Sequence, residues 1–181
     1  MGQTFAQKIL ARHARLDSVA PGQIVTVLPD LLLSHDNTAA IVNKIKTELQ
    51  TYGVFDPRRH VIVLDHVIPA SDARSATNHA QIRDYAQTFA IPHFYDIGEG
   101  ICHQLMMEKG HVQPGLLILG SDSHTCTYGA GNTFAAGIDR TEAAAIILSG
   151  ETWLKVPESI KIEFKGKLNP GVTAKDVILS I

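Results

Sequence analysis

The sequence predicts an α/β fold, a three-layer α/β/α domain built around a mainly parallel sheet, with its functional site at the carboxyl edge of the strands. Segments with helical spacing of apolar residues alternate along the chain with short strand-like runs. Two of these runs, residues 61–64 and 116–119, pass without a spacer into polar residues of catalytic types. The 181 residues are the length of one domain, so we treat residues 1–181 as a single unit.

The individual elements follow from the spacing of apolar residues. Helical segments carry them three and four positions apart, as at Phe5 and Ile9, whereas buried strands are short unbroken runs. Near the carboxyl end, Ile160, Ile162 and Phe164 alternate with charged residues, which is typical of a strand with one face in water. In chain order we expect a helix at 4–13, strand at 24–28, helix at 38–49, strand at 61–64, helix at 75–89, strand at 91–96, helix at 101–109, strand at 116–119, helix at 141–148, strand at 160–165 and helix from 173.

The last expected helix opens with a capping box, Thr173 to Asp176, in which Asp stands where Glu or Gln is usual. It has no capping residue before the sequence stops. We therefore expect the α/β/α domain to be truncated at residue 181.

Composition excludes several classes of protein. Lys and Arg number 16 against 18 Asp and Glu, the net charge is −2, and the basic residues are scattered, so no nucleic-acid partner is expected. No apolar run approaches the roughly 18 residues of a membrane span, and the amino end has no secretory core. Two cysteines cannot form the framework of a disulfide-rich secreted protein. A cytoplasmic protein that does not associate with membranes is the simplest interpretation.

Acidic and imidazole side chains follow two of the expected strands. Asp65 and His66 come directly after one run, and Asp122 and His124 after the other. An Asp can fix the tautomer of a neighbouring imidazole and stabilise its charged form, which suits proton transfer near neutral pH. If the two strands are close in the sheet, these residues form an acid/base site. The alternative is that each Asp only caps its loop by accepting backbone N–H groups.

A glycine-rich turn at residues 97–100 leads into the expected helix at 101–109, with His103 in its first turn. Free backbone N–H groups at such a helix start favour anions, so a carboxylate or phosphate substrate is expected, unless the turn is only a connection. Cys102 is interpreted as a packing residue. Cys126 is either a small loop residue or a reactive thiol.

A series of motifs resembles, in order and spacing, the amino-terminal part of proteins of the aconitase superfamily, most closely the large subunits of its 3-isopropylmalate dehydratase and homoaconitase branch. The resemblance covers nearly the whole chain. The motifs are Asp65-His66 with Pro69, residues 98–104 (GEGICHQ), Pro114-Gly115, residues 120–127 (GSDSHTCT), residues 155–158 (KVPE) and residues 171–179 (GVTAKDVIL).

The resemblance implies an iron-sulfur hydro-lyase that isomerises a hydroxy di- or tricarboxylate by dehydration and rehydration. The foremost candidate reaction is that of 3-isopropylmalate dehydratase in leucine biosynthesis, and the alternatives are homoaconitase or another aconitase-type dehydratase. The open iron of a 4Fe-4S cluster would act as a Lewis acid on the leaving hydroxyl. A small subunit with a swivelling domain is the implied partner.

The resemblance also implies roles for individual residues. Asp65 and His66 resemble the pair that helps the hydroxyl to leave as water. Asp122 resembles the partner that orients His103, and Ser123 resembles a donor to a substrate carboxylate. The full implied set is Asp65, His66, His103, Asp122 and His124 as catalytic residues, with His124 as the third imidazole, and Ser123 and His35 as substrate-binding residues.

The cluster ligands of this superfamily are three cysteine thiolates that come later in the chain, and neither Cys102 nor Cys126 matches them. We therefore expect no metal ligand within these residues and no activity of this chain alone. Two other readings stay open. One is a mononuclear metal hydrolase that binds zinc through His66, His103, His124 and the two Asp, although adjacent Asp and His residues suit orientation as well as ligation. The other is a non-catalytic binding or assembly module.

Overall fold

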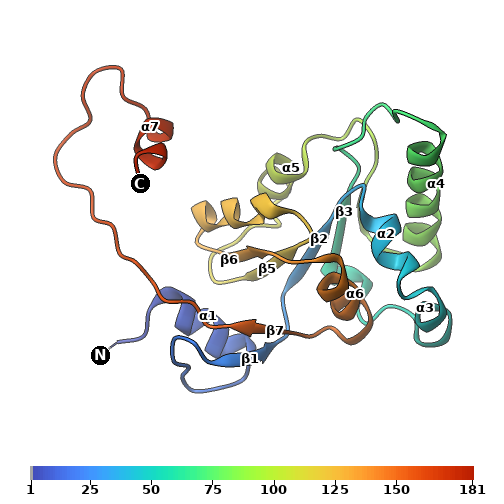
Figure 1. Cartoon of the computed structure of the whole chain (residues 1–181), viewed down its shortest axis with the longest axis horizontal. Helices are drawn as coiled ribbons and strands as arrows, with labels where there is room; N and C mark the ends of the chain where they lie inside the picture. Colours follow the sequence, from blue (N-terminus) through green and yellow to red (C-terminus); the bar gives the residue numbers. More distant parts are fainter. Residues whose placement is uncertain (1) are drawn as a thin grey trace.

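The fold is known from a computed structural model that describes residues 2–181. Its centre is a parallel sheet of five strands with the order β4-β3-β2-β5-β6. A separate antiparallel pair joins β1 to β7 below the sheet in Figure 1. The strands are β1 (Ile24–Val27), β2 (Leu31–Ser34), β3 (His60–Val63), β4 (His93–Tyr95), β5 (Leu117–Gly120), β6 (Phe134–Gly137) and β7 (Thr152–Lys155).

Helices cover both faces of the sheet (Figure 1). The α-helices are α1 (Phe5–His13), α2 (Thr38–Asn43), α3 (Lys46–Tyr52), α4 (Ala73–Thr88), α5 (Cys102–Glu108), α6 (Arg140–Ser149) and α7 (Ala174–Leu179). Two 3-10 helices, η1 (Pro57–Arg59) and η2 (Ser123–Gly131), connect strands to their neighbours.

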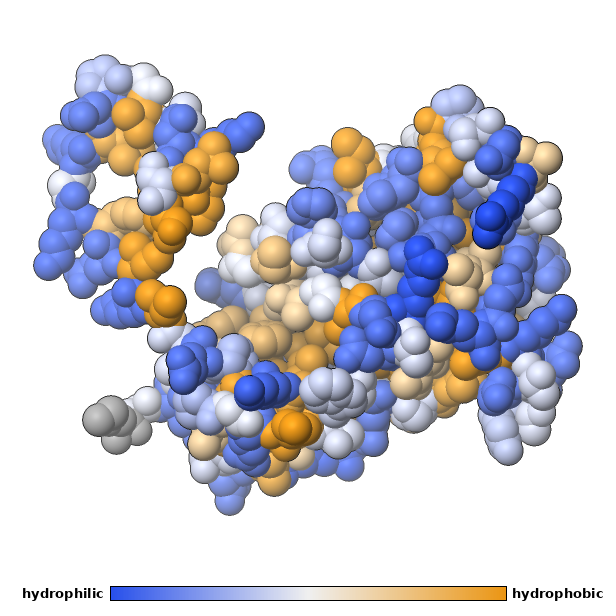
Figure 2. All heavy atoms as spheres, viewed as in Figure 1, coloured by the Kyte–Doolittle hydropathy of each residue, from blue (hydrophilic) through white to orange (hydrophobic). Residues whose placement is uncertain are grey.

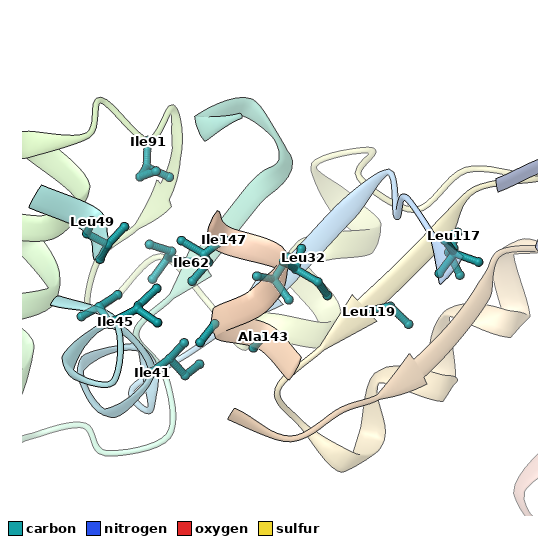
Figure 3. Close-up of a cluster of buried hydrophobic side chains, with 14 of the residues drawn as sticks. Leu32, Ile41, Ile45, Leu49, Ile62, Ile91, Leu117, Leu119, Ala143 and Ile147 are labelled. Atoms are coloured by element: carbon teal, nitrogen blue, oxygen red, sulfur yellow. The ribbon is translucent and has the colours of Figure 1, made fainter. Parts of the chain in front are cut away.

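Alternation along the central strands divides the core into two layers. On one face, Leu32, Ile62 and Leu119 pack against α2, α4 and α6, and Figure 3 shows this cluster with Ile41 and Ile147. The other face is buried against α5 and η2, with the side chains Leu33, Val63, Ile118, Met106 and Tyr128. Each fully buried Leu or Ile contributes roughly 1.5–3 kcal/mol. The predicted three-layer α/β/α architecture with a parallel sheet is confirmed.

Several predicted helices form close to their expected bounds. Helix α1 begins after Thr4, which forms a capping box with Gln7. Helix α6 begins after Asp139 with a second capping box and ends at Gly150, whose φ of 76° is the left-handed conformation that glycine tolerates. The capping box predicted at Thr173 also forms, and α7 follows it.

Other predictions were wrong. Residues 38–49 do not form one helix, because Ile45 leaves the helical conformation (φ −125°, ψ 23°) and separates α2 from α3, while Ile45 and Leu49 both stay in the core. Strands β2, β6 and β7 were not predicted. Within the described residues no strand forms at 160–165. Ile160 there is 90% exposed.

The segment from residue 157 onwards forms an arm that leaves the body and carries α7 at its end (Figure 1). Nearly every residue of the arm is exposed, and Figure 2 shows apolar surface along it. A strand needs a hydrogen-bonded neighbour, and the alternating residues 160–165 have none among the described residues. No helix within residues 2–181 has the length and apolar character that a membrane span requires.

Candidate functional site

The predicted site residues gather where the strand order of the sheet reverses. From β2 the chain adds β3 and β4 on one side, then returns to add β5 and β6 on the other. Ligands of open α/β sheets bind at such a switch point, outside the carboxyl ends of the strands. Here the carboxyl ends of β2, β3 and β5 lead into residues 35–36, 65–66 and 121–124 respectively.

The Asp65 carboxylate uses both of its oxygens. Oδ1 lies 2.7 Å from Nδ1 of His66, and Oδ2 accepts the backbone N–H of Cys102 at 2.6 Å. Because an ionised carboxylate only accepts hydrogen bonds, Nδ1 of His66 carries a hydrogen, and Nε2 is left for chemistry. The start of α5, which the sequence suggested as an anion site, is thus capped by Asp65 of the protein itself.

Asp122 orients a second imidazole. Its Oδ1 lies 2.8 Å from Nε2 of His103, so this nitrogen donates. Nδ1 of His103 lies 2.8 Å from the hydroxyl of Tyr128. Burial raises the pKa of Tyr128, which keeps its hydroxyl protonated and able to donate to the ring. His103 is therefore held on both sides in a single tautomer.

The two pairs meet at Asp122. Oδ2 of Asp122 lies 3.4 Å from Nε2 of His66, so one carboxylate faces both His66 and His103. Burial by itself would lower the pKa of His66, but the hydrogen bond to Asp65 and the nearby negative charges outweigh it and raise that pKa above its ordinary value. Burial likewise opposes ionisation of Asp122, yet hydrogen bonds from His124 and His103 hold its pKa below the usual range. The arrangement favours an imidazolium beside a carboxylate.

His35 lies beneath this pair. Its ring stacks on that of His66 with centroids 3.9 Å apart. Its Nδ1 atom is buried without a hydrogen-bond partner in the part of the chain that the structure describes. Burial and the neighbouring His66 lower the pKa of His35, which favours the neutral ring.

Ser123 and His124 form the exposed rim of the site. The backbone N–H of His124 donates to Oδ1 of Asp122 at 2.8 Å, and its side chain is 81% exposed. The hydroxyl of Ser123 lies 3.5 Å from Nδ1 of His124. The structure thus brings the sequence-predicted residues together, with His35 at the base and Ser123 and His124 outermost.

A polar cleft adjoins this constellation. It has a volume of about 620 Å³, and its lining residues include His35, His66, Arg74 and Arg140. Room for a small polar molecule therefore exists next to His66.

Some residues that build the site were not foreseen. Tyr128 positions His103, Asp36 accepts hydrogen bonds from the Asp65-His66 turn, and Asn37 ties β2 to β5 by donating to the carbonyl of Ser121 at 2.8 Å. Their partners are 25 or more positions away along the chain. The only available signal was that Asp36 and Asn37 lie beside His35.

The described side chains do not fit an iron-sulfur cluster. The sequence has two cysteines, of which Cys102 is buried and Cys126 exposed. Burial and the adjacent Asp65 raise the pKa of Cys102, whereas a cluster ligand must be a thiolate. Cluster ligation is therefore not assigned to any residue of this chain.

A single metal ion is a closer geometric match. Ligand-type atoms lie within 4.8 Å of one another in His35, His66 and Asp122, and again in His103, Asp122 and His124. Ligation needs a free lone pair on the imidazole, however, and Nε2 of His103 already donates to Asp122. Hydrogen-bonded acid/base pairs explain these contacts without an ion.

The chain thus has a doubly wound parallel sheet with paired imidazoles and carboxylates at its switch point, which is where α/β domains of this class bind their ligands. The sequence model of the aconitase family (aconitate hydratase) matches residues 7–181 of the chain. The chain belongs to the aconitase family, and the resemblance found in the sequence is confirmed.

Similar proteins share one description. The chain is 48% identical over 180 residues to the 3-isopropylmalate dehydratase large subunit of Heliobacterium modesticaldum, which covers 99% of this chain and 43% of that protein. It is 44% identical over 181 residues to the 3-isopropylmalate dehydratase large subunit 1 of Methanopyrus kandleri, and the match covers 100% of this chain and 43% of that protein. It is 46% identical over 182 residues to the 3-isopropylmalate dehydratase large subunit of Aquifex aeolicus, and the match covers 99% of this chain and 41% of that protein. The chain spans about two fifths of the length of the curated relatives it matches.

Proposed function

We propose that the chain is the site-bearing amino-terminal part of the large subunit of a hydro-lyase of the 3-isopropylmalate dehydratase type. The observation that carries this proposal is the linked arrangement in which Asp122 faces His66 and His103 while Asp65 holds His66 from the other side. Homoaconitase and other aconitase-type dehydratases remain the alternatives, because no described contact distinguishes one hydroxy acid from another.

In this proposal His66 is the acid that lets a hydroxyl leave as water. Its Nε2 atom is the nitrogen not bonded to Asp65, and its side chain is 38% exposed. The raised pKa lets Nε2 hold a proton near neutral pH and donate it to the departing oxygen. Asp65 and Asp122 stabilise the charged ring before the transfer, and the hydrogen bond to Asp65 holds the neutral ring in the same orientation afterwards.

His103, His124 and Ser123 have supporting roles. Asp122 and Tyr128 fix the ring of His103 beside the site. His124 and Ser123 lie at the rim, where they can meet a substrate carboxylate. Ser123 would donate to that carboxylate, and His35 would contact the substrate from beneath His66.

The aconitase family membership supports an iron-sulfur cofactor, which would supply Lewis acidity at the leaving hydroxyl. Its ligands would have to come from residues outside this chain. The matched relatives are named large subunits, which supports a small subunit as partner, and we place the assembled enzyme in the cytoplasm.

The test is activity of a two-subunit enzyme whose large subunit contains this sequence. Supplied anaerobically with 3-isopropylmalate, homocitrate, dimethylmalate and citrate in separate reactions, it should form an alkene fastest from 3-isopropylmalate. His111→Ala serves as a control, because the hydrogen bond and ring contacts of His111 are with Tyr95 and His93 and not with a candidate site residue. This variant should keep its turnover. An enzyme with a full cluster that dehydrates none of these acids would disprove the proposal.

A further inference from the structure

One carboxylate outside the assigned set holds the turn that carries Asp65 and His66. Oδ2 of Asp36 accepts the backbone N–H groups of Asp65 at 3.1 Å and of His66 at 2.8 Å. Oδ1 accepts the backbone N–H of Val67 at 3.3 Å and lies 2.7 Å from Nε2 of His79. Three successive amides of the turn therefore end on a single side chain.

The pair behind the turn is rigidly placed. Asp36 follows β2, and His79 projects from the middle of α4, which lies beside α2 (Figure 1). Their side chains are only 7% and 3% exposed. A buried carboxylate that receives several hydrogen bonds is strongly anchored, because each bond to a charged acceptor is stronger than a neutral one. The position of the turn is thus set by a strand and a helix, not by the turn itself.

The charge of Asp36 is part of the arrangement. Burial opposes its ionisation, but the hydrogen bonds from His66 and His79 lower its pKa below the usual range. Since an ionised carboxylate only accepts, His79 must donate from Nε2. The negative charge of Asp36 also acts on His66, together with the charges of Asp65 and Asp122.

We propose that Asp36 and His79 form a positioning pair, which fixes the Asp65-His66 turn in the geometry that proton donation by His66 requires. The inference deepens the proposed function and rests on it for the catalytic consequence. The structural part, that this pair orders the turn, stands independently.

The variant Asp36→Asn tests the structural part in this chain. An amide presents one oxygen and one NH₂ group, so one side of the new side chain must face donors without accepting them. Hydrogen exchange at the amides of residues 65–67 should speed up by about tenfold or more, in line with the loss of a hydrogen bond to a charged acceptor. The pKa of His66, followed by NMR, should fall because a nearby negative charge is removed.

A matched control is Asp30→Asn. Asp30 is also a carboxylate that pairs with a histidine, His13, and accepts a backbone N–H, that of Leu117, but at the amino end of β5. This variant should leave exchange at residues 65–67 and the pKa of His66 unchanged. If both variants loosen the turn equally, the effect is general destabilisation and the inference is overturned.

Variants of His79 keep the test decisive if Asp36→Asn does not fold. His79→Gln places an amide NH₂ group near the position of Nε2 and should preserve slow exchange. His79→Phe fills similar space without a donor and should speed exchange at residues 65–67. Equal exchange in both variants would contradict a positioning role for His79.

The catalytic consequence is measured in the two-subunit enzyme. Asp36→Asn and His79→Phe should lower kcat by about tenfold or more with KM nearly unchanged, and His79→Gln should restore most of the turnover. A loosened turn with wild-type kcat would overturn the catalytic part of the inference. If the wild-type enzyme shows no dehydratase activity, the proposed function fails, while the exchange and NMR results still decide whether Asp36 orders the turn.

Discussion

At the residue scale, Asp122 is the point on which the site depends. It faces His66 and His103 and also accepts the backbone N–H of His124. Removing the charge of Asp122 would change the orientation of the His103 ring and lower the pKa of His66. This is why neighbouring Asp and His residues are better explained here as orienting pairs than as metal ligands.

A second Asp and His pair gives a pH-dependent prediction at the same scale. Nδ1 of His13 lies 2.8 Å from the carbonyl of Ile9, and Nε2 lies 2.7 Å from Asp30. Both partners accept, so the ring is an imidazolium. Burial alone would lower the pKa of His13, but the hydrogen bonds to Asp30 and Ile9 raise it above the ordinary value of 6.5.

Because the pKa of His13 is higher in the folded chain than in the unfolded one, the charged ring stabilises the fold. This stabilisation is complete below about pH 6.5 and is lost as pH rises through the folded pKa. His13→Gln should therefore lower the free energy of unfolding by roughly 1.5–3 kcal/mol at about pH 5.5 and by less at about pH 9. Urea unfolding at the two pH values measures this. A loss that stays constant with pH would mean that the pKa of His13 is the same in the folded and unfolded chain, and a loss that is larger at about pH 9 would mean that folding favours the neutral ring.

At the element scale, the site depends on how closely the Asp122 loop lies on the sheet. A Cβ atom at Gly137 of β6 would lie 2.8 Å from the backbone oxygen of Asp122. Gly137→Ala should push the loop away and lower the free energy of unfolding by about 1–3 kcal/mol, as overpacking does.

Gly129→Ala is the control, because a Cβ atom there would meet nothing within 4 Å. Chemical unfolding gives the stability of both variants, and NMR shifts of the His103 ring report the loop. If Gly137→Ala matches wild type in stability and in these shifts, the close approach does not restrict the loop.

The elements differ in how far their sequences predict them. The strand at 61–64 could be predicted because it is a β-branched apolar run, and α6 because Gly150 follows a segment with helical spacing. Strand β6, with sequence FAAG, has little strand propensity and is held by pairing with β5. The prediction of a strand at 160–165 was wrong for the opposite reason. The alternating pattern there is strong, but no partner strand lies beside it among the described residues.

The site residues also differ in how far the sequence predicts them. Asp65 and His66 could be predicted because they directly follow an apolar run, and Asp122 because it lies in the short polar segment after another. Asp36 and His79 could not, because they are 43 positions apart and neither stands in a local pattern that indicates the other. Tyr128 reads as an ordinary loop residue until the fold brings it to His103.

At the scale of the whole molecule, the chain brings the candidate acid/base residues together but has only two cysteines. Incubated anaerobically with iron and sulfide, it should hold no stable 4Fe-4S cluster, because two thiols cannot supply three ligands. Visible absorbance and iron analysis measure this. It should also purify without stoichiometric zinc. One tightly bound zinc per chain, lost in His66→Ala or His124→Ala, would instead favour a mononuclear metal hydrolase.

The central claim is that His66, held by Asp65, donates the proton to the leaving hydroxyl, and that neither residue binds the cluster. Its most direct test is the two-subunit enzyme with His66→Ala or Asp65→Asn, measured for kcat and for cluster absorbance in the same samples. We expect kcat to fall by about 10²-fold or more while the absorbance stays at the wild-type level. The control Cys126→Ser should change neither quantity. Wild-type turnover in His66→Ala, or loss of the cluster in either Asp65→Asn or Cys126→Ser, would contradict the account.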